Sequence, residues 1–279
     1  MRLAMIAALV GTLLVTEAYG WNSISYAGVL HDNFWLSLHN RAAVCHSPET
    51  NCHKLENPRQ AILWTVRGLW PMRGHRNFTF TSPNDTFHID EIKCIRDDLN
   101  RFWPSHNSSN EVLWADEFME YGTYAIYQGT KVTNALEYFN VTLQLYKHFD
   151  ISKWLTTGHI SPSNKKPISR RDIQNAVSLR YSSSFYLYCQ GQKNGIDILW
   201  EIRLCFDSNL QPASNCIPPE MTCHTWGVWY LEDSLISKGS LCRTSVPSAV
   251  RLRSPIHSIF TVVLSRRSSS LGRPFDSRC

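Results

Sequence analysis

The chain of 279 residues has few charged side chains and no long apolar run beyond its N-terminal segment. Charged residues make up 18% of it, against 43% hydrophobic and 12% aromatic residues, a composition that excludes wholesale disorder. The best later apolar run, residues 259–264, is too short to span a bilayer. We therefore expect a folded domain with a sizeable core and no membrane span.

The predicted domain also lacks an excess of positive charge. The formal net charge is +5, but residues 243–279 alone hold seven arginines and one acid, Asp276, so residues 21–242 are close to neutral. The basic composition therefore does not indicate a phosphate-attracting body. Because residues 243–279 are rich in Ser and Arg with almost no periodicity, we expect a disordered tail after a domain at 21–242.

The N-terminus has the pattern of a secretory leader. Arg2 precedes an apolar run over residues 3–15, and the small residues Ala18 and Gly20 stand three and one positions before a cleavage at Trp21. This run is shorter than a bilayer is thick, which favours a signal peptide at residues 1–20 over a membrane anchor. The sequence thus predicts a secreted or endo-lysosomal protein.

Sequons and cysteines agree with export. Four Asn-x-Ser/Thr sequons predict glycosylation, at Asn77, Asn84, Asn107 and Asn140. Nine cysteines in an exported chain indicate disulfides. Cys-His pairs occur at Cys45, Cys52 and Cys223, but neither C-x2-C nor H-x3-H spacing accompanies them. We therefore expect no metal and no other cofactor.

Periodicity predicts strands first, then helices, then strands. The expected strands are 31–39, 61–66, 185–189, 196–205 and 225–231, and the expected helices are 90–103, 111–127, 131–149 and one that begins near Ser169. This order favours an α+β domain over a doubly wound parallel sheet.

Two segments resemble the signatures of the ribonuclease T2 family. Residues 64–71, W-T-V-R-G-L-W-P, resemble the family's F/W-T-I-H-G-L-W-P, and residues 113–124, L-W-A-D-E-F-M-E-Y-G-T-Y, resemble F/W-x-H-E-W-x-K-H-G-T-C. Further similarity at 34–38, 99–105, 138–151 and 201–205 extends the resemblance over roughly residues 31–242. It implies a ribonuclease T2-like α+β fold, a central, mainly antiparallel sheet packed by several helices.

The resemblance also implies a chemistry. Members of this family are metal-independent endoribonucleases that cleave single-stranded RNA through a 2′,3′-cyclic phosphate. The reaction needs a base for the 2′-hydroxyl proton and an acid for the 5′-oxygen, and imidazole suits both roles because its pKa lies near working pH. The implied partner is RNA.

Most of the implied catalytic groups are replaced in this chain. Arg67 stands where the family has its first His, Tyr121 where it has the second, Glu120 at the Lys and Asp116 at the auxiliary His; Glu117 is retained. Arginine exchanges no proton near neutrality, and tyrosine, with a pKa of about 10, does so only if strongly shifted. The resemblance therefore predicts a site without the family's proton shuttles.

Other substitutions change the surroundings of this site. Trp70 is retained at a position that implies substrate contact, with a buried core tryptophan as the competing interpretation, and Met72 replaces an Asp found in many members. Carboxylates now gather where the family offers cations. We expect Arg67 to form an ion pair with Glu117, or as second choice with Glu120, and the ring of Tyr121 to pack beside it.

The resemblance implies three disulfides. The expected pairs are Cys45–Cys52, Cys189–Cys242 and Cys205–Cys216. A fourth disulfide of the family is not expected here, because Tyr124 replaces one of its cysteines and the other has no counterpart in this chain. Cys94 and Cys223 are candidates for an additional bond, which leaves Cys279 over.

Three functional hypotheses follow. The leading one is a secreted glycoprotein that is catalytically inactive and acts by binding RNA or an unidentified protein or glycan. The alternative is an active or weakly active ribonuclease with a rebuilt site, which uses Glu117 and a relocated histidine such as His39 or His75. A structural or storage role is the third, because one fold hosts unrelated functions.

Overall fold

The computed structural model describes residues 33–47, 52, 62–73, 76–77, 86–127, 132–216 and 223–233. The predicted signal peptide and Ser/Arg-rich tail lie outside these residues, as do His75, Asn84, Cys242 and Cys279.

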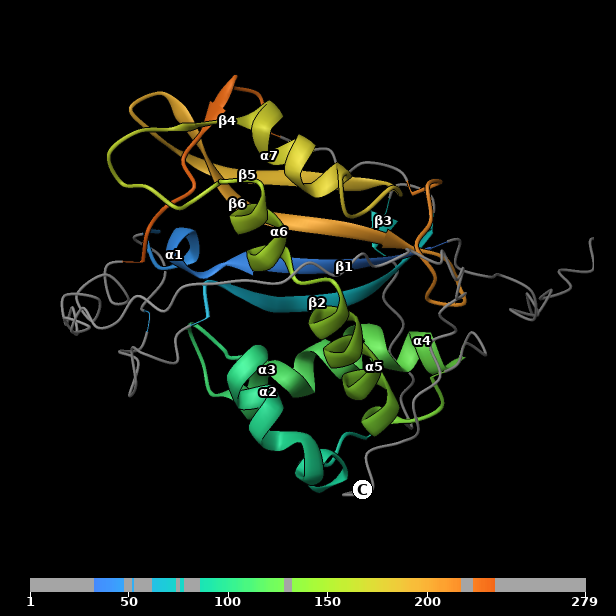
Figure 1. Cartoon of the computed structure of the whole chain (residues 1–279). Helices are drawn as coiled ribbons and strands as arrows, with labels where there is room; N and C mark the ends of the chain where they lie inside the picture. The colour runs from blue at the N-terminus through green and yellow to red at the C-terminus, as the bar shows by residue number, and fades with distance from the viewer. Residues whose placement is uncertain are drawn as a thin grey trace, which may run out of the picture.

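A five-stranded sheet forms the centre of the described structure (Figure 1). Its strand order is β3-β2-β1-β6-β5, with β1 (Asn33–Asn40), β2 (Trp64–Arg73), β3 (Arg76–Asn77), β5 (Phe185–Lys193) and β6 (Ile196–Phe206). Every pairing within it is antiparallel, which confirms the predicted sheet. A second, two-stranded sheet joins β4 (Ile168–Ser169) to β7 (Gly227–Val228). The strand expected at 225–231 is thus much shorter than predicted.

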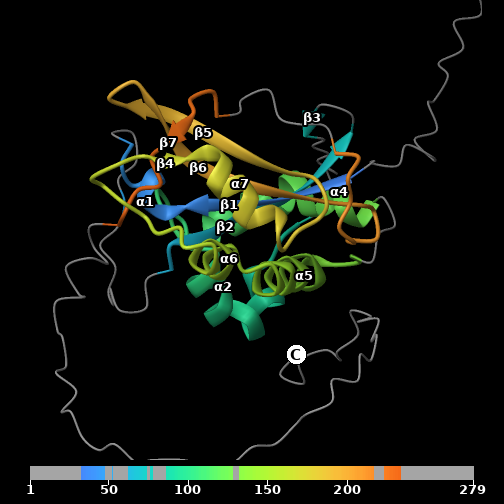
Figure 2. The same cartoon turned by 45° about the horizontal axis from the view of Figure 1, so that its top comes forward.

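Helices fill the middle of the chain and flank the sheet (Figures 1 and 2). They are α1 (Arg41–Val44), the 3₁₀ helix η2 (Ile89–Ile95), α2 (Arg96–Phe102), α3 (Asn110–Glu117), the π-helical turn η3 (Phe118–Gly122), α4 (Thr123–Tyr127), α5 (Ala135–His148), α6 (Ile151–Thr157) and α7 (Arg170–Ser178). Side chains that accept a backbone N–H begin several of them, among them Ser109, Asn134, Asp150 and Ser169. The predicted start near Ser169 is confirmed.

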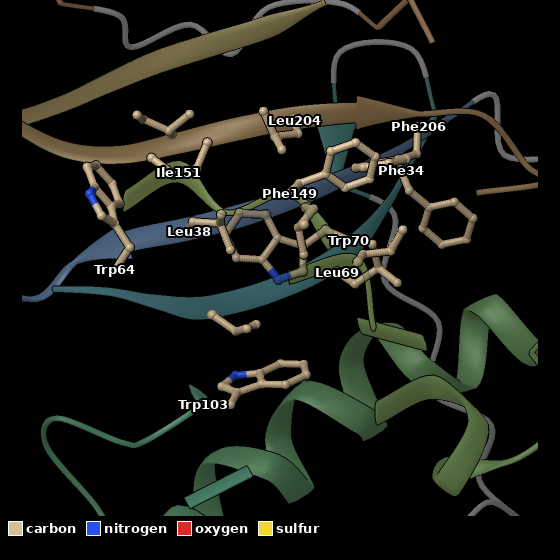
Figure 3. Packing of buried hydrophobic residues seen from close by; sticks show 14 of the residues in the cluster. Phe34, Leu38, Trp64, Leu69, Trp70, Trp103, Phe149, Ile151, Leu204 and Phe206 are labelled. Atoms are coloured by element: carbon tan, nitrogen blue, oxygen red, sulfur yellow. The ribbon is translucent and has the colours of Figure 1, made fainter. Parts of the chain in front are cut away.

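Apolar burial holds the helices to the sheet. Phe149, which follows α5, contacts Phe206 of β6 at a ring distance of 5.2 Å, and Leu38 and Leu204 are fully buried nearby (Figure 3). Trp103, at the end of α2, is also fully buried and lies between β2 and the helices below it (Figure 3). This core covers one face of the sheet and leaves polar side chains of β1 and β6 on the other.

Two of the three expected disulfides are present. Cys45–Cys52 closes the loop after α1 with Cα atoms 5.5 Å apart, and Cys205–Cys216 joins the end of β6 to the following loop with Cα atoms 5.9 Å apart.

The expected Cys189–Cys242 bond is wrong. Cys189 bonds Cys223 instead, with Cα atoms 4.9 Å apart. The physical reason is that the segment around Trp229 pairs with β6, which brings Cys223 beside β5. This bond also excludes a Cys94–Cys223 pair, although Cys94 is itself disulfide-bonded.

Within the described part of the chain, we find no helix with the length and apolar character that crossing a bilayer requires.

Candidate functional site

A β-bulge aims Arg67 away from the regular ladder. Ser37 of β1 lies opposite Gly68 of β2, whereas the next residue, Leu38, lies opposite Val66, so Arg67 is the extra residue. Bulges of this kind redirect a side chain and are frequent beside active sites. The Arg67 side chain is 40% exposed and lines a cleft.

Strand pairing places a polar row on the same side of the sheet. His39 pairs with Glu201, and Ser37 pairs with Arg203, across β1 and β6. Tyr188 of β5 lies on the other side of Glu201. Because side chains two residues apart share a face, these five residues gather on one surface.

Glu201 is the buried centre of this row, at 3% exposure. It accepts hydrogen bonds from Ser37 Oγ at 2.6 Å and from Arg203 Nε at 2.7 Å, and His39 Nε2 lies 3.1 Å from it. Burial alone would raise the pKa of Glu201, but His39, Arg203 and Ser37 hold it below its ordinary value. Burial lowers the pKa of His39, although its hydrogen bond to Glu201 acts in the opposite direction.

Glu117, the last residue of α3, approaches Arg67 from the helical side and is not itself among the residues that line the cleft. It is 6% exposed and accepts a 3.1 Å hydrogen bond from Trp70 Nε1. Arg67 Nη1 lies 3.6 Å from Glu117, and Arg67 Nε lies 4.0 Å from Glu201. The expected Arg67–Glu117 pair is therefore present, with the guanidinium shared between two carboxyls. Burial raises the pKa of Glu117 to about 8, against the opposing effects of Arg67 and Trp70.

Trp70 is packed on several sides. It is 4% exposed, and the guanidinium carbons of Arg203 and Arg67 lie 5.1 Å and 5.6 Å from its ring centroid. Tyr121 packs against it at a ring distance of 5.7 Å. Trp70 thus positions Glu117 and both arginines, and little of its ring is open to a ligand.

The remaining predicted residues lie outside the cleft. Asp116 and Glu120 are exposed and are not among its lining residues. The helix geometry explains this, because Glu117 and Tyr121 face the sheet across the turn η3 while Asp116 and Glu120 face solvent. Met72 is buried in a small cluster with Trp35.

The cleft has a volume of about 500 Å³ and lies between the sheet and the loop before α3. Its polar and aromatic lining residues include His39, Arg67, Trp70, His106, Tyr121, Tyr188, Gln190, Trp200, Glu201 and Arg203. The ring of His106 lies 6.1 Å from that of His39. The sequence did not predict that His106, Glu201 and Arg203 lie at this cleft. For Glu201 and Arg203 a signal exists, because they are charged residues two positions apart in an otherwise apolar strand.

A cleft with two guanidinium groups suits a phosphate ligand. A metal suits it poorly. Cys45, Cys52 and His106 bring ligand atoms within 4.8 Å of one another, but both sulfurs are joined in the disulfide and offer no thiolate.

Several known proteins that are similar to this chain in sequence are ribonucleases. The chain is 28% identical to human Ribonuclease T2 over 220 residues, which cover 75% of this chain and 82% of the human protein. It is 31% identical to Ribonuclease T2 of Sus scrofa over 196 residues, covering 67% and 94%. Ribonuclease DdI of Dictyostelium discoideum is 27% identical over 153 residues, covering 55% of this chain and 66% of that protein.

Solved structures show the same fold. RNase NT, crystallised in complex with 5′-AMP, superposes with a TM-score of 0.63 at 19% identity and covers 72% of this chain and 98% of its own. An RNase-related protein from Calystegia sepium gives a TM-score of 0.58 at 24% identity, covering 72% and 98%. The model of the Ribonuclease T2 family matches residues 31–216. Together with the sheet and its cleft, this match shows that the chain belongs to the ribonuclease T2 family.

Proposed function

We propose that this chain is a secreted glycoprotein of the family that binds single-stranded RNA in the cleft without cleaving it. The observation that carries the proposal is Arg67, a guanidinium where the family signature has a proton-transferring histidine, held between Glu117 and Glu201. Such a group binds phosphate well and exchanges no proton.

The charge balance of the cleft supports binding. Burial raises the pKa of Glu117, which reduces the negative charge that this carboxyl sets against Arg67. Arg67 and Arg203 then face Glu201 as the main buried anion, so the cleft carries net positive charge. Tyr188 and Trp200 line it and supply rings for base stacking. The solved structures of RNase NT and of a mutant of RNase MC1 hold 5′-AMP and 5′-GMP, respectively.

A rebuilt catalytic site is the second candidate, and the position of His106 favours it. His39 and His106 face the same cleft with ring centroids 6.1 Å apart, beside two arginines. In this alternative the neutral His39 accepts the 2′-hydroxyl proton and a protonated His106 donates one to the leaving 5′-oxygen. Glu117 then keeps a supporting role.

One set of assays separates the two candidates. Purified protein is incubated with single-stranded polyuridylate between pH 4 and 8, and binding and cleavage are measured together. We expect wild type to bind RNA and to show no turnover above that of a heat-killed control. The affinity of Arg203→Ala for the same RNA should be at least tenfold lower. Cleavage that is lost in both His39→Ala and His106→Ala would establish the rebuilt site instead. If the protein shows no binding and no cleavage, both candidate functions are refuted.

The leader, the sequons and the cysteines support export. We propose a mature protein that begins at Trp21, with a folded domain at 21–242 and an appended tail at 243–279. Mass spectrometry of protein from the culture medium of a eukaryotic host tests this. A product with an intact leader or with unmodified Asn107 would contradict the export proposal.

A further inference from the structure

We infer that an N-linked glycan on Asn107 stands at the rim of the cleft and limits its access to short RNA. Asn107-Ser108-Ser109 is a sequon without proline at its middle position. Asn107 is exposed, as a glycan acceptor must be, and it lines the same cleft as Arg67 and His39. The inference rests on the proposed RNA-binding function of this cleft.

The loop that carries Asn107 is held in a defined position. Ser108 N donates to Ser105 Oγ at 3.0 Å, and Ser105 N donates to Asn110 Oδ1 at 2.7 Å. Asn110 Nδ2 in turn donates to Asn100 Oδ1 of α2 at 2.8 Å. These bonds hold the loop on both sides of Asn107, so the attachment point of the first sugar keeps its place beside the cleft.

The next residues tie the same loop to the helix below. Ser109 is the N-cap of α3, and its side chain accepts a hydrogen bond from Val112 N. α3 ends at Glu117, which faces Arg67. The loop that carries Asn107 therefore leads directly into the short helix whose last residue is the carboxyl that pairs with Arg67.

The consequence is a steric limit on ligand length. An N-glycan is bulky and hydrophilic and lacks positive charge to attract RNA. A mononucleotide fits within a cleft of about 500 Å³, whereas an oligonucleotide must continue past the rim. We therefore expect the glycan to weaken binding of long chains and to leave binding of single nucleotides unchanged.

Asn140 provides the matched control. Its sequon lies on α5, and Thr142, the third residue, is fully buried with its hydroxyl donating to Tyr138 O. Asn140 is not a lining residue of the cleft. Asn140→Gln therefore removes a sequon without altering the rim.

The experiment compares secreted wild type, Asn107→Gln and Asn140→Gln. Intact mass measures occupancy, and anisotropy measures binding of a short single-stranded oligouridylate and of 5′-UMP. Hydroxyl-radical footprinting measures exposure of Tyr188 and Trp200 in the cleft, with Trp226, which is 88% exposed, as internal reference.

We expect Asn107 to be occupied, oligonucleotide affinity to rise at least fivefold in Asn107→Gln, and 5′-UMP affinity to stay the same. Oxidation of Tyr188 and Trp200 should at least double in that variant and stay unchanged in Asn140→Gln. Unoccupied Asn107, or identical footprints in all three proteins, would overturn the inference. If no variant binds RNA, the proposed function fails, while the footprint still decides whether the glycan covers the cleft.

Discussion

At the scale of single residues, Gly68 has no room for a side chain because Trp70 and Glu117 occupy that space. A Cβ there would overlap the indole nitrogen of Trp70 and lie 2.5 Å from Glu117 Oε2. Gly68→Ala should therefore break the Trp70–Glu117 hydrogen bond and lower the free energy of unfolding by about 1–3 kcal/mol. Urea denaturation measures this change. Gly227→Ala is the control, because its Cβ makes its nearest contact at an ordinary 3.4 Å; equal losses in both variants would contradict the explanation.

Glu117 predicts a pH dependence of stability. Its pKa in the folded protein is about 8, above the ordinary 4.5, so the folded state binds more protons than the unfolded state between these values. The stabilising effect is complete below about pH 4.5 and is lost as pH rises through 8. Glu117→Gln cannot titrate and keeps an oxygen for Trp70.

Between pH 5 and pH 8, wild type should therefore lose up to about 4 kcal/mol of unfolding free energy relative to Glu117→Gln. Urea denaturation of both proteins at both pH values measures the difference, and the titration of His39 cancels because both proteins carry it. Parallel pH profiles would show that Glu117 is ionised throughout.

At the scale of elements, the Cys189–Cys223 bond fastens the segment before β7 to β5. It closes a chain separation of 34 residues, against 7 for Cys45–Cys52. Since the entropy removed from the unfolded chain grows with loop length, replacing both cysteines of the longer loop by Ala should cost about 2–4 kcal/mol. The same double replacement in the shorter loop should cost less. Urea denaturation of the two variants measures the order, and a reversed order would contradict this account.

Sequence patterns predicted the positions of strands and helices better than they predicted breaks within them. Strands expected at 31–39, 185–189 and 196–205 correspond to β1, β5 and β6, because long apolar strands are strong local signals. The helix expected at 111–127 is broken by the π-helical turn η3, since side-chain periodicity does not register one residue added to a turn. α6 was missed because its seven residues are too few for a periodic pattern.

The residues of the site could be predicted where they belong to one of the two family signatures, and not elsewhere. The Arg67–Glu117 pair followed from two signatures whose residues lie together in the family. Glu201 and Arg203 reach the cleft only because β6 pairs with β1, and His106 because its loop lies over the sheet. Such long-range placements, like the partner of Cys189, depend on topology that no local pattern contains.

At the scale of the whole molecule, the cleft has few cations, so binding of RNA should depend only moderately on salt. If Arg67 and Arg203 are the two phosphate contacts, the logarithm of the affinity should fall with the logarithm of salt concentration with a slope of about −1.4 for single strands. Titrations of an oligouridylate at several salt concentrations measure it. Arg203→Ala should roughly halve the slope; an unchanged slope in this variant would place the phosphates elsewhere.

The central claim is that the family cleft persists in this chain while the proton transfer is lost. The most direct measurement is the formation of 2′,3′-cyclic phosphate from polyuridylate, between pH 4 and 8, by wild type and by the variant Arg67→His, Glu120→Lys, Tyr121→His. We predict no product above a heat-killed control from wild type and measurable product from the triple variant, because β2 and the turn η3 still present positions 67 and 121 to one cleft. Turnover by wild type, with a pH profile that disappears in His39→Ala, would contradict the account.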